Sequence, residues 1–235
     1  LAALNLGLGL VVLPETVTDK TRRPFTRARG NPIGALRAVA RLPGMRRPLM
    51  TFLLLAVAMN VYPSVWAFFG KARFGWDTSM IGYSLALYGV SFALGQALMV
   101  GPLIKRFGEH KAATLGMIFD VATLTLLGLV TSGTLALVLT PVTALGGVVT
   151  PAIQALLSRQ AADDSQGELQ GVLSSLSALA MITSPLAMTA IFARFTAPDA
   201  AIFAPGAPFL LAAILVVAAM TLHVAPSQES TADPA

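Results

Sequence analysis

The stretch AATLGMIFDVATLTLLGLV, residues 112–130, decides the fold class of this chain. It is apolar throughout except for its threonines and one ionisable residue, Asp120. A helix of this length crosses the ~30 Å hydrocarbon core of a bilayer at ~1.5 Å per residue. Asp120 follows Lys111 by nine residues, which places its carboxylate roughly 13 Å into that core. The stretch therefore predicts a transmembrane helix that contains an acid.

Five further apolar blocks of similar length surround this one. The blocks predicted to span the membrane are 48–69, 79–104, 112–130, 134–157, 167–193 and 207–225. Of the 235 residues, 55% are hydrophobic and only 11% are charged, whereas average soluble domains contain about 25% charged residues. This composition indicates an all-α membrane protein, with lipid as the solvent for most of the chain.

The segments outside the six blocks are assigned by their length and charge. Residues 1–13 are apolar but too short to cross a bilayer, and we interpret them as the end of a transmembrane helix whose start is missing. Residues 14–47 are basic and are predicted to form a cytoplasmic loop, in which 33–42 suit either a short amphipathic helix or a flexible linker. Residues 226–235 are predicted to be a cytoplasmic tail.

The basic residues indicate the orientation of the chain in the membrane. Thirteen of the sixteen lysines and arginines fall on the side of residues 14–47, and Lys71, Arg73 and Arg194 fall on the other. Cytoplasmic loops of membrane proteins carry such an excess. These residues lie between apolar blocks rather than on one amphipathic face. The net charge of +5 is therefore an orientation signal, and we expect no nucleic-acid partner.

The strongly polar residues inside the blocks are the candidates for function. An intramembrane carboxylate such as Asp120 costs ~2.5–3.5 kcal/mol on insertion scales, and such groups often relay protons. The alternative for Asp120 is a structural acid that is protonated or capped by a neighbouring hydroxyl. Gln96 and Asn60 are predicted either to contact substrate on a cavity wall or to form interhelical hydrogen bonds.

Helix breakers interrupt three of the blocks, at Pro63, at Gly146-Gly147 with Pro151, and at Pro185. Such bends suit helices that line a cavity and move between states, although glycine and proline are also frequent in membrane helices generally.

Motifs for catalysis or for metal binding are absent from the sequence. It contains no cysteine, no P-loop, no nucleophile elbow and no zinc-protease motif, and its two histidines lie far apart. We expect no catalytic residue, no metal and no cofactor, and so a protein that is not an enzyme.

Several segments, in this order and spacing, carry a resemblance to a known family. They are Leu13-Pro14-Glu15-Thr16, WAFFGKARFGWDTSMIG (66–82), QALMVGPLIKRFGEHK (96–111), GMIFD (116–120) and GGVVTPAIQALLSRQAADDSQGELQG (146–171). The chain resembles the tetracycline-resistance type drug/proton antiporters of the major facilitator superfamily. The resemblance implies a twelve-helix transporter of which this chain holds the end of helix six, the central loop and helices seven to twelve.

The resemblance also implies roles for individual residues. Asp120 matches an intramembrane aspartate that matters for transport, and Gln96 matches a glutamine of helix eight near the path of substrate and proton. The loop after helix eight looks like a copy of the superfamily's cytoplasmic gating motif, and its assigned residues are Gly101, Lys105, Arg106, Gly108 and Lys111. The chain departs from the family at Lys105, where the motif usually has an acid. It also departs at Phe92, where several members have a histidine implicated in coupling, which counts against tetracycline itself as the substrate.

The leading hypothesis is proton-coupled efflux of small amphipathic drugs, tetracycline-like or multidrug, across the bacterial inner membrane by alternating access. The expected partners are a drug, protons, the lipid bilayer and a missing N-terminal six-helix half. Two alternatives stay open, namely a metabolite or sugar permease of the same fold and a non-transporting membrane scaffold or sensor.

Overall fold

The computed structural model describes residues 44–161 and 165–225, and all regular elements in these ranges are helical. Five helical stretches are long and apolar enough to cross a membrane; they are Arg46–Phe74, Thr78–Leu129, Gly133–Gln160, Gln166–Thr196 and Ala207–Val224. The predicted all-α membrane class is confirmed for the described residues. The interpretations of residues 1–13, of residues 14–43 of the basic loop and of the tail 226–235 lie outside them.

The first stretch is interrupted where the sequence places a breaker. Helices α3 (Arg46–Met59) and α4 (Val61–Phe74) meet at Asn60. Pro63 lies four residues after Met59 and has no N–H, so the Met59 carbonyl loses its α-helical donor. The Asn60 amide Nδ2 donates a 2.7 Å hydrogen bond to the carbonyl of Ala56 and so covers another acceptor at this junction.

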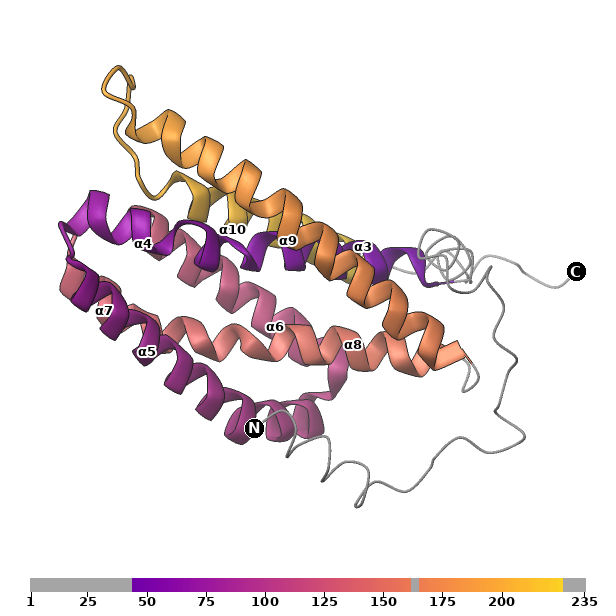
Figure 1. The fold of residues 1–235 in the computed structure, drawn as a ribbon. Coiled ribbons are helices and arrows are strands. Elements are labelled where there is room, and N and C mark those ends of the chain that lie inside the picture. The colour runs from indigo at the N-terminus through magenta and orange to yellow at the C-terminus, as the bar shows by residue number, and fades with distance from the viewer. Residues whose placement is uncertain (1–43, 162–164, 226–235) are drawn as a thin grey trace, which may run out of the picture.

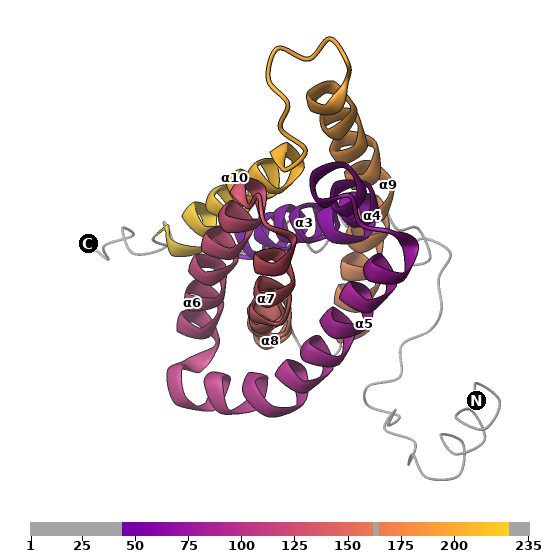
Figure 2. The ribbon, with the colours of Figure 1, turned by 90° about the vertical axis from the view of Figure 1, so that its left-hand side faces the viewer.

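The second stretch contains two spans. Helix α5 (Thr78–Gly95), the π-helical turn η1 (Gln96–Val100) and α6 (Gly101–Leu129) follow one another directly. Within α6, however, Gly108 has φ 74° and ψ 163°, a conformation that is open essentially to glycine alone. The chain turns there, and α5 and α6 form the two arms of a U (Figure 2). The five stretches therefore provide six spans, in agreement with the six apolar blocks.

The third stretch also changes its helix type midway. Helix α7 (Gly133–Thr143) passes through the 3-10 turn η2 (Ala144–Val148) into α8 (Val149–Gln160). Mid-helix stretches of 3-10 geometry often mark hinges. The turn lies against α5, η1 and α6, which brings the irregular parts of two neighbouring spans together.

The remaining helices, α9 (Gln166–Thr196) and α10 (Ala207–Val224), complete the bundle. Helix α10 packs along α3 and α6, and α9 packs along α3 and α4 (Figure 1). Apolar side chains such as Phe52 and Phe209 fill the interior. Ser184 of α9 donates a 2.8 Å hydrogen bond to the carbonyl of Val57 in α3. This packing leaves α4, α5 and α7 around one pocket, with α6 behind η2.

Candidate functional site

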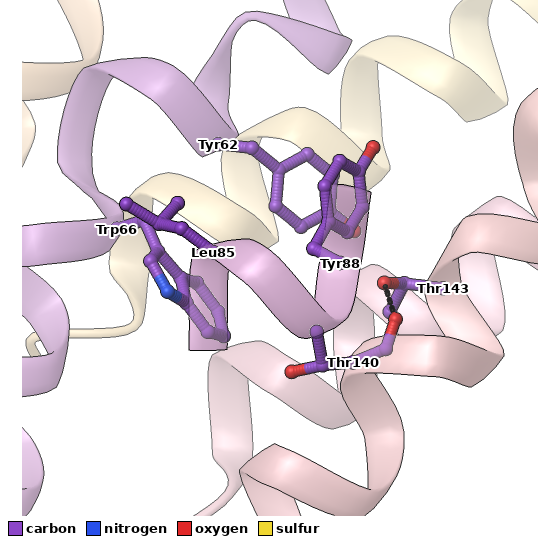
Figure 3. A pocket seen from close by; sticks show the side chains of 6 residues that line it. All are labelled: Tyr62, Trp66, Leu85, Tyr88, Thr140 and Thr143. Atoms are coloured by element: carbon purple, nitrogen blue, oxygen red, sulfur yellow. Dashed lines mark hydrogen bonds between the residues drawn. The ribbon is translucent and has the colours of Figure 1, made fainter. Parts of the chain in front are cut away.

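A small pocket lies among α4, α5 and α7. Its lining residues are Tyr62, Trp66, Leu85, Tyr88, Thr140 and Thr143 (Figure 3). Half of the lining residues are aromatic, and the hydroxyls belong to the two tyrosines and the two threonines. The Tyr62 hydroxyl points toward Thr143 and interacts with its side chain. The pocket therefore offers flat apolar faces with a few directional polar groups, as small-molecule sites commonly do.

Three nearly parallel rings form one side of this region. The centroids of Tyr62 and Tyr88 lie 5.5 Å apart with an interplanar angle of 26°, and those of Tyr88 and Phe92 lie 5.9 Å apart at 22°. Offset ring pairs at such distances stabilise one another by ~0.5–1.5 kcal/mol. Leu85, Tyr88, Phe92 and Gln96 recur at helical spacing along one face of this span. Sequence reasoning missed the two tyrosines, and this spacing is the signal that points to Tyr88.

The indole of Trp66 is held in place by hydrogen bonds. Its Nε1 donates a 2.8 Å bond to Ser84 Oγ, and that hydroxyl donates a 2.7 Å bond to the carbonyl of Ile81. Trp66 and Ser84 are both buried. A buried indole N–H needs such a partner, because leaving it unpaired costs ~1–3 kcal/mol. The chain of bonds fixes one wall of the pocket and ties α4 to α5.

Asp120 lies on α6 beside η2, the turn that directly follows the pocket residue Thr143. Its side chain is 5% exposed, and its carboxylate packs against Gly146 of η2, where any Cβ would overlap Oδ1. Within residues 44–161 and 165–225, no side chain forms an ion pair or a hydrogen bond with this carboxylate. Its electrostatic neighbours are the phenols of Tyr62 and Tyr88. Because no basic side chain of the described ranges pairs with this carboxylate, the gain or loss of one proton strongly changes the local electrostatics.

Gln96 contacts the same turn from the other side. Its Nε2 donates a 2.8 Å hydrogen bond to the carbonyl of Gly147. Four residues after Gly147 stands Pro151, which has no N–H to supply the usual α-helical bond. Gln96 therefore supplies a donor to the carbonyl that this proline leaves without one. The structure thus brings Asp120 to Gly146 and Gln96 to Gly147, two neighbouring residues of one turn. The bond of Gln96 is an interhelical hydrogen bond, one of the two roles predicted for it.

Asn60 is not brought to the pocket. Its side-chain amide bonds to Ala56 in the preceding turn, and its carbonyl accepts a 2.6 Å hydrogen bond from Ser64 Oγ. Both contacts are local to the junction of α3 and α4. The assignment of Asn60 to substrate binding stays a prediction.

The residues of the predicted gating loop lie in the first part of α6, around the bend at Gly108. Gly108 forms the bend, and the guanidinium of Arg106 lies 5.5 Å from the centroid of the Phe107 ring. Gly101, Lys105, Arg106 and Lys111 are exposed. Their role in gating stays a prediction.

Two contacts that sequence reasoning missed attach this bend to the rest of the bundle. Glu109 lies 2.6 Å from Arg159 at the end of α8. The His110 ring stacks on His223 of α10 with centroids 4.0 Å apart, and His223 Nε2 lies 3.2 Å from the His110 carbonyl. No local pattern in the sequence signals either pair, because the partners lie far apart along the chain.

Several known proteins are similar to this chain in sequence. Residues 49–235 match the profile of the Major Facilitator Superfamily. The tetracycline resistance protein of class C from Escherichia coli is 40% identical over 193 residues, which cover 82% of this chain and 48% of that protein. The class B protein from Escherichia coli is 32% identical over 170 residues, 72% of this chain and 42% of that protein. The chain spans about half the length of these curated relatives.

A solved structure shares the fold. The crystal structure of the human organic anion transporter MFSD10 (TETRAN) superposes with a TM-score of 0.79 over 94% of this chain and 55% of that one, at 22% sequence identity. This likeness shows the fold alone. The match of the sequence profile over most of the chain and the all-helical bundle lead to one conclusion: the chain belongs to the Major Facilitator Superfamily.

Proposed function

We propose that this chain is part of a proton-coupled exporter of small amphipathic drugs in the bacterial inner membrane. One observation carries the proposal: the buried carboxylate of Asp120 packs against Gly146, three residues after the pocket residue Thr143. A proton site and a ligand site that are this close can influence each other. The relatives that are named tetracycline resistance proteins support a drug as the substrate.

The chemistry of the pocket favours a partly apolar ligand with ring systems. The rings of Tyr62, Trp66 and Tyr88 offer faces on which a planar group stacks. Thr140 and Thr143 donate their hydroxyl protons to the carbonyls of Ala136 and Thr140, at 2.8 Å and 2.7 Å. The Thr140 oxygen then remains as an acceptor for a polar edge of the ligand, whereas the Thr143 oxygen already interacts with the Tyr62 hydroxyl.

Alternating access needs spans that bend and ends that open. The junction at Asn60 and the turns η1 and η2 interrupt three spans, as in other transporters in which discontinuous helices line the substrate path. On the side that the basic residues mark as cytoplasmic, Glu109–Arg159 and His110–His223 join different spans. In the proposed cycle these contacts form when that side closes and break when it opens.

The proposal includes the place of the chain in a longer protein. Residues 48–225 correspond to helices seven to twelve, residues 14–47 to the central cytoplasmic loop and residues 1–13 to the end of helix six. A first six-helix half supplies the other side of the cavity. The fact that the relatives are about twice as long supports this assignment. No chemical change of the substrate is part of the cycle.

The test uses the complete gene product, reconstituted in liposomes with an imposed pH gradient and a panel of drugs that includes tetracycline. We expect drug flux that needs the gradient and that Asp120→Asn lowers at least about a hundredfold, as expected when an essential proton carrier is lost. Asp77→Asn is the matched control, because Asp77 is exposed and accepts the N-cap bond of Met80 at 2.8 Å, a role that asparagine also fills.

Two results would overturn this proposal. Gradient-driven uptake of a sugar or a metabolite, without movement of any drug, would support a permease. No flux of any tested compound in well-folded protein would support a scaffold or a sensor.

A further inference from the structure

The two irregular turns in the middle of this bundle touch each other. The π-helical η1 and the 3-10 η2 belong to neighbouring spans and are in contact. Within helices, 3-10 stretches often mark hinges and π-helical turns are frequent at functional sites. Gly146 and Gly147 are residues of η2, and the proposed function as described gives neither glycine a task.

The two glycines face different helices. At Gly146 the space of a side chain is filled by Asp120 Oδ1 from α6. At Gly147 an added Cβ would lie 2.8 Å from Phe92 Cε2 of α5 and 2.9 Å from Gln96 Nε2 of η1. Successive residues of a 3-10 turn point about 120° apart, which explains the two directions. Gly146 thus contacts the buried acid on α6. Gly147 contacts the face of α5 and η1 that continues into the pocket.

The backbone at this point is less firmly held than in a regular helix. Pro151 removes the donor that would bind the Gly147 carbonyl in an α-helix, and the N–H of Val149 bonds to Gly146 three residues back. The side chain of Gln96 provides the hydrogen bond to Gly147. A small shift of η2 therefore moves the Gly147 carbonyl, and the Gln96 amide must move with it to keep the hydrogen bond.

We propose that Gly146-Gly147 is the link by which the proton on Asp120 sets the position of Gln96 and Phe92, on the helical face that continues to Leu85 and Tyr88 in the pocket wall. The inference rests on the proposed function and adds positioning residues to it. When Asp120 gains or loses its proton, its contact with Gly146 changes and η2 shifts. The Gly147 carbonyl moves with the turn and carries the Gln96 amide, while the Phe92 ring follows its contact with Gly147.

The other titratable groups near Asp120 do not compete for this role. Those that interact with it in the described part of the chain are the phenols of Tyr62 on α4 and Tyr88 on α5. From α7, α8, α10 and η1, no charged side chain of the described ranges forms an ion pair with it. Phenols ordinarily titrate near pH 10, far above the working range of a cell. Asp120 is thus the group at this place whose protonation changes during a transport cycle.

The test measures pocket geometry without measuring transport. The chain contains no cysteine, so Leu85→Cys introduces one thiol into the wall of the pocket. In the complete gene product, with any cysteine outside this chain replaced, its rate of maleimide labelling is compared near pH 5.5 and near pH 8. Rates are divided by those of Thr131→Cys, an exposed position between α6 and α7 that corrects for the titration of the thiol itself. We expect the corrected rate to change about fivefold with pH, a typical size for coupling between two sites.

Three variants test whether the pH response of labelling passes through Asp120 and Gly146-Gly147. Asp120→Asn is expected to abolish the pH response. Pro151→Ala restores an N–H that can bind the Gly147 carbonyl, and Gln96→Leu removes the side-chain donor, so each is expected to lower the response to less than about twofold. Pro141→Ala is the matched control. It makes the same exchange in the same span, but the N–H that it restores faces a different carbonyl, that of Leu137, and it is expected to keep the response.

The possible results are distinct. If the parent protein shows no pH response, or if Pro151→Ala and Gln96→Leu keep it in full, the link is wrong. The link is also wrong if Pro141→Ala abolishes the response.

If labelling behaves as expected but no drug is moved, the link stands and the proposed function fails. If the proton gradient drives drug flux but Pro151→Ala leaves the pH response of labelling unchanged, the proposed function stands and the link fails. Size-exclusion profiles in detergent confirm folding, and Gln96→Leu, at a half-buried position, carries the test if Pro151→Ala does not fold.

Discussion

The Glu109 carboxylate lies 2.6 Å from the guanidinium of Arg159, and this pair joins the bend of α6 at Gly108 to the end of α8. The Arg159 side chain is 73% exposed, whereas that of Glu109 is 13% exposed. Because Arg159 is open to solvent, water and salt screen the attraction, and such a pair stabilises a fold by only ~0–1 kcal/mol. The pair is therefore better suited to favouring one conformation of this end than to holding the bundle together.

Reversing the charge of Glu109 tests that interpretation. Glu109→Arg places two cations side by side, and we expect drug efflux to fall about tenfold while the melting temperature changes little. Combining Glu109→Arg with Arg159→Glu restores the attraction and is expected to recover most of the efflux. Drug accumulation in cells and thermal melts in detergent provide the two measurements. Full activity of the single reversal would contradict a role for this pair.

Gly146→Ala is expected to disturb both stability and coupling. A methyl group at position 146 overlaps Asp120 Oδ1, so the carboxylate or η2 must move, at a cost of ~1–3 kcal/mol. The expected results are a lower melting temperature and loss of gradient-driven efflux. Gly89→Ala in α5 is the control, because no atom lies near its added Cβ. That change should stabilise the protein by roughly 0.5–1 kcal/mol.

Tyr88 tests the aromatic wall. Tyr88→Ala removes the ring that stacks between Tyr62 and Phe92, and we expect the KM for an aromatic drug to rise about three- to tenfold. Tyr88→Phe keeps the ring and should stay within about twofold of the parent. Transport assays over a range of drug concentrations give KM and kcat separately. A KM that does not change in Tyr88→Ala would place the drug elsewhere.

The bend at Gly108 predicts a difference between two glycines of the same loop. Gly108→Ala forces a side chain into φ 74°, ψ 163°, which costs on the order of 1–3 kcal/mol, although space around it is open. Gly101 has a helical φ of −59° and equally open surroundings, so Gly101→Ala should be neutral or slightly stabilising. Thermal melts of the two variants measure this difference. Equal melting temperatures would show that the bend relaxes at no cost.

The sequence predicted the spans well because the physics of a span is local. An apolar run of sufficient length has few alternatives in lipid, and breakers such as Pro63 act on their own neighbours. Asp120 could be identified for a similar reason, since a carboxylate in such a run is costly wherever the run packs.

What the sequence could not predict depends on which helices meet. Tyr62 and Tyr88 are ordinary aromatic residues of membrane helices until α4 and α5 bring their rings together. Glu109 and Arg159 lie fifty residues apart, and only the packing of α8 near the bend of α6 makes them partners. Asn60 shows the opposite case. Its amide has a donor that can reach the helix's own backbone, and this local contact competes with any role in a cavity.

The bond between Gln96 and the Gly147 carbonyl has an evolutionary consequence. It compensates for an N–H that Pro151 does not have, so the glutamine and the proline form a pair although they lie in different spans. In a homologue with another residue at the position of Pro151, the backbone can satisfy its own carbonyl. Selection for a side-chain amide at the position of Gln96 should then relax, and the two alignment columns should covary.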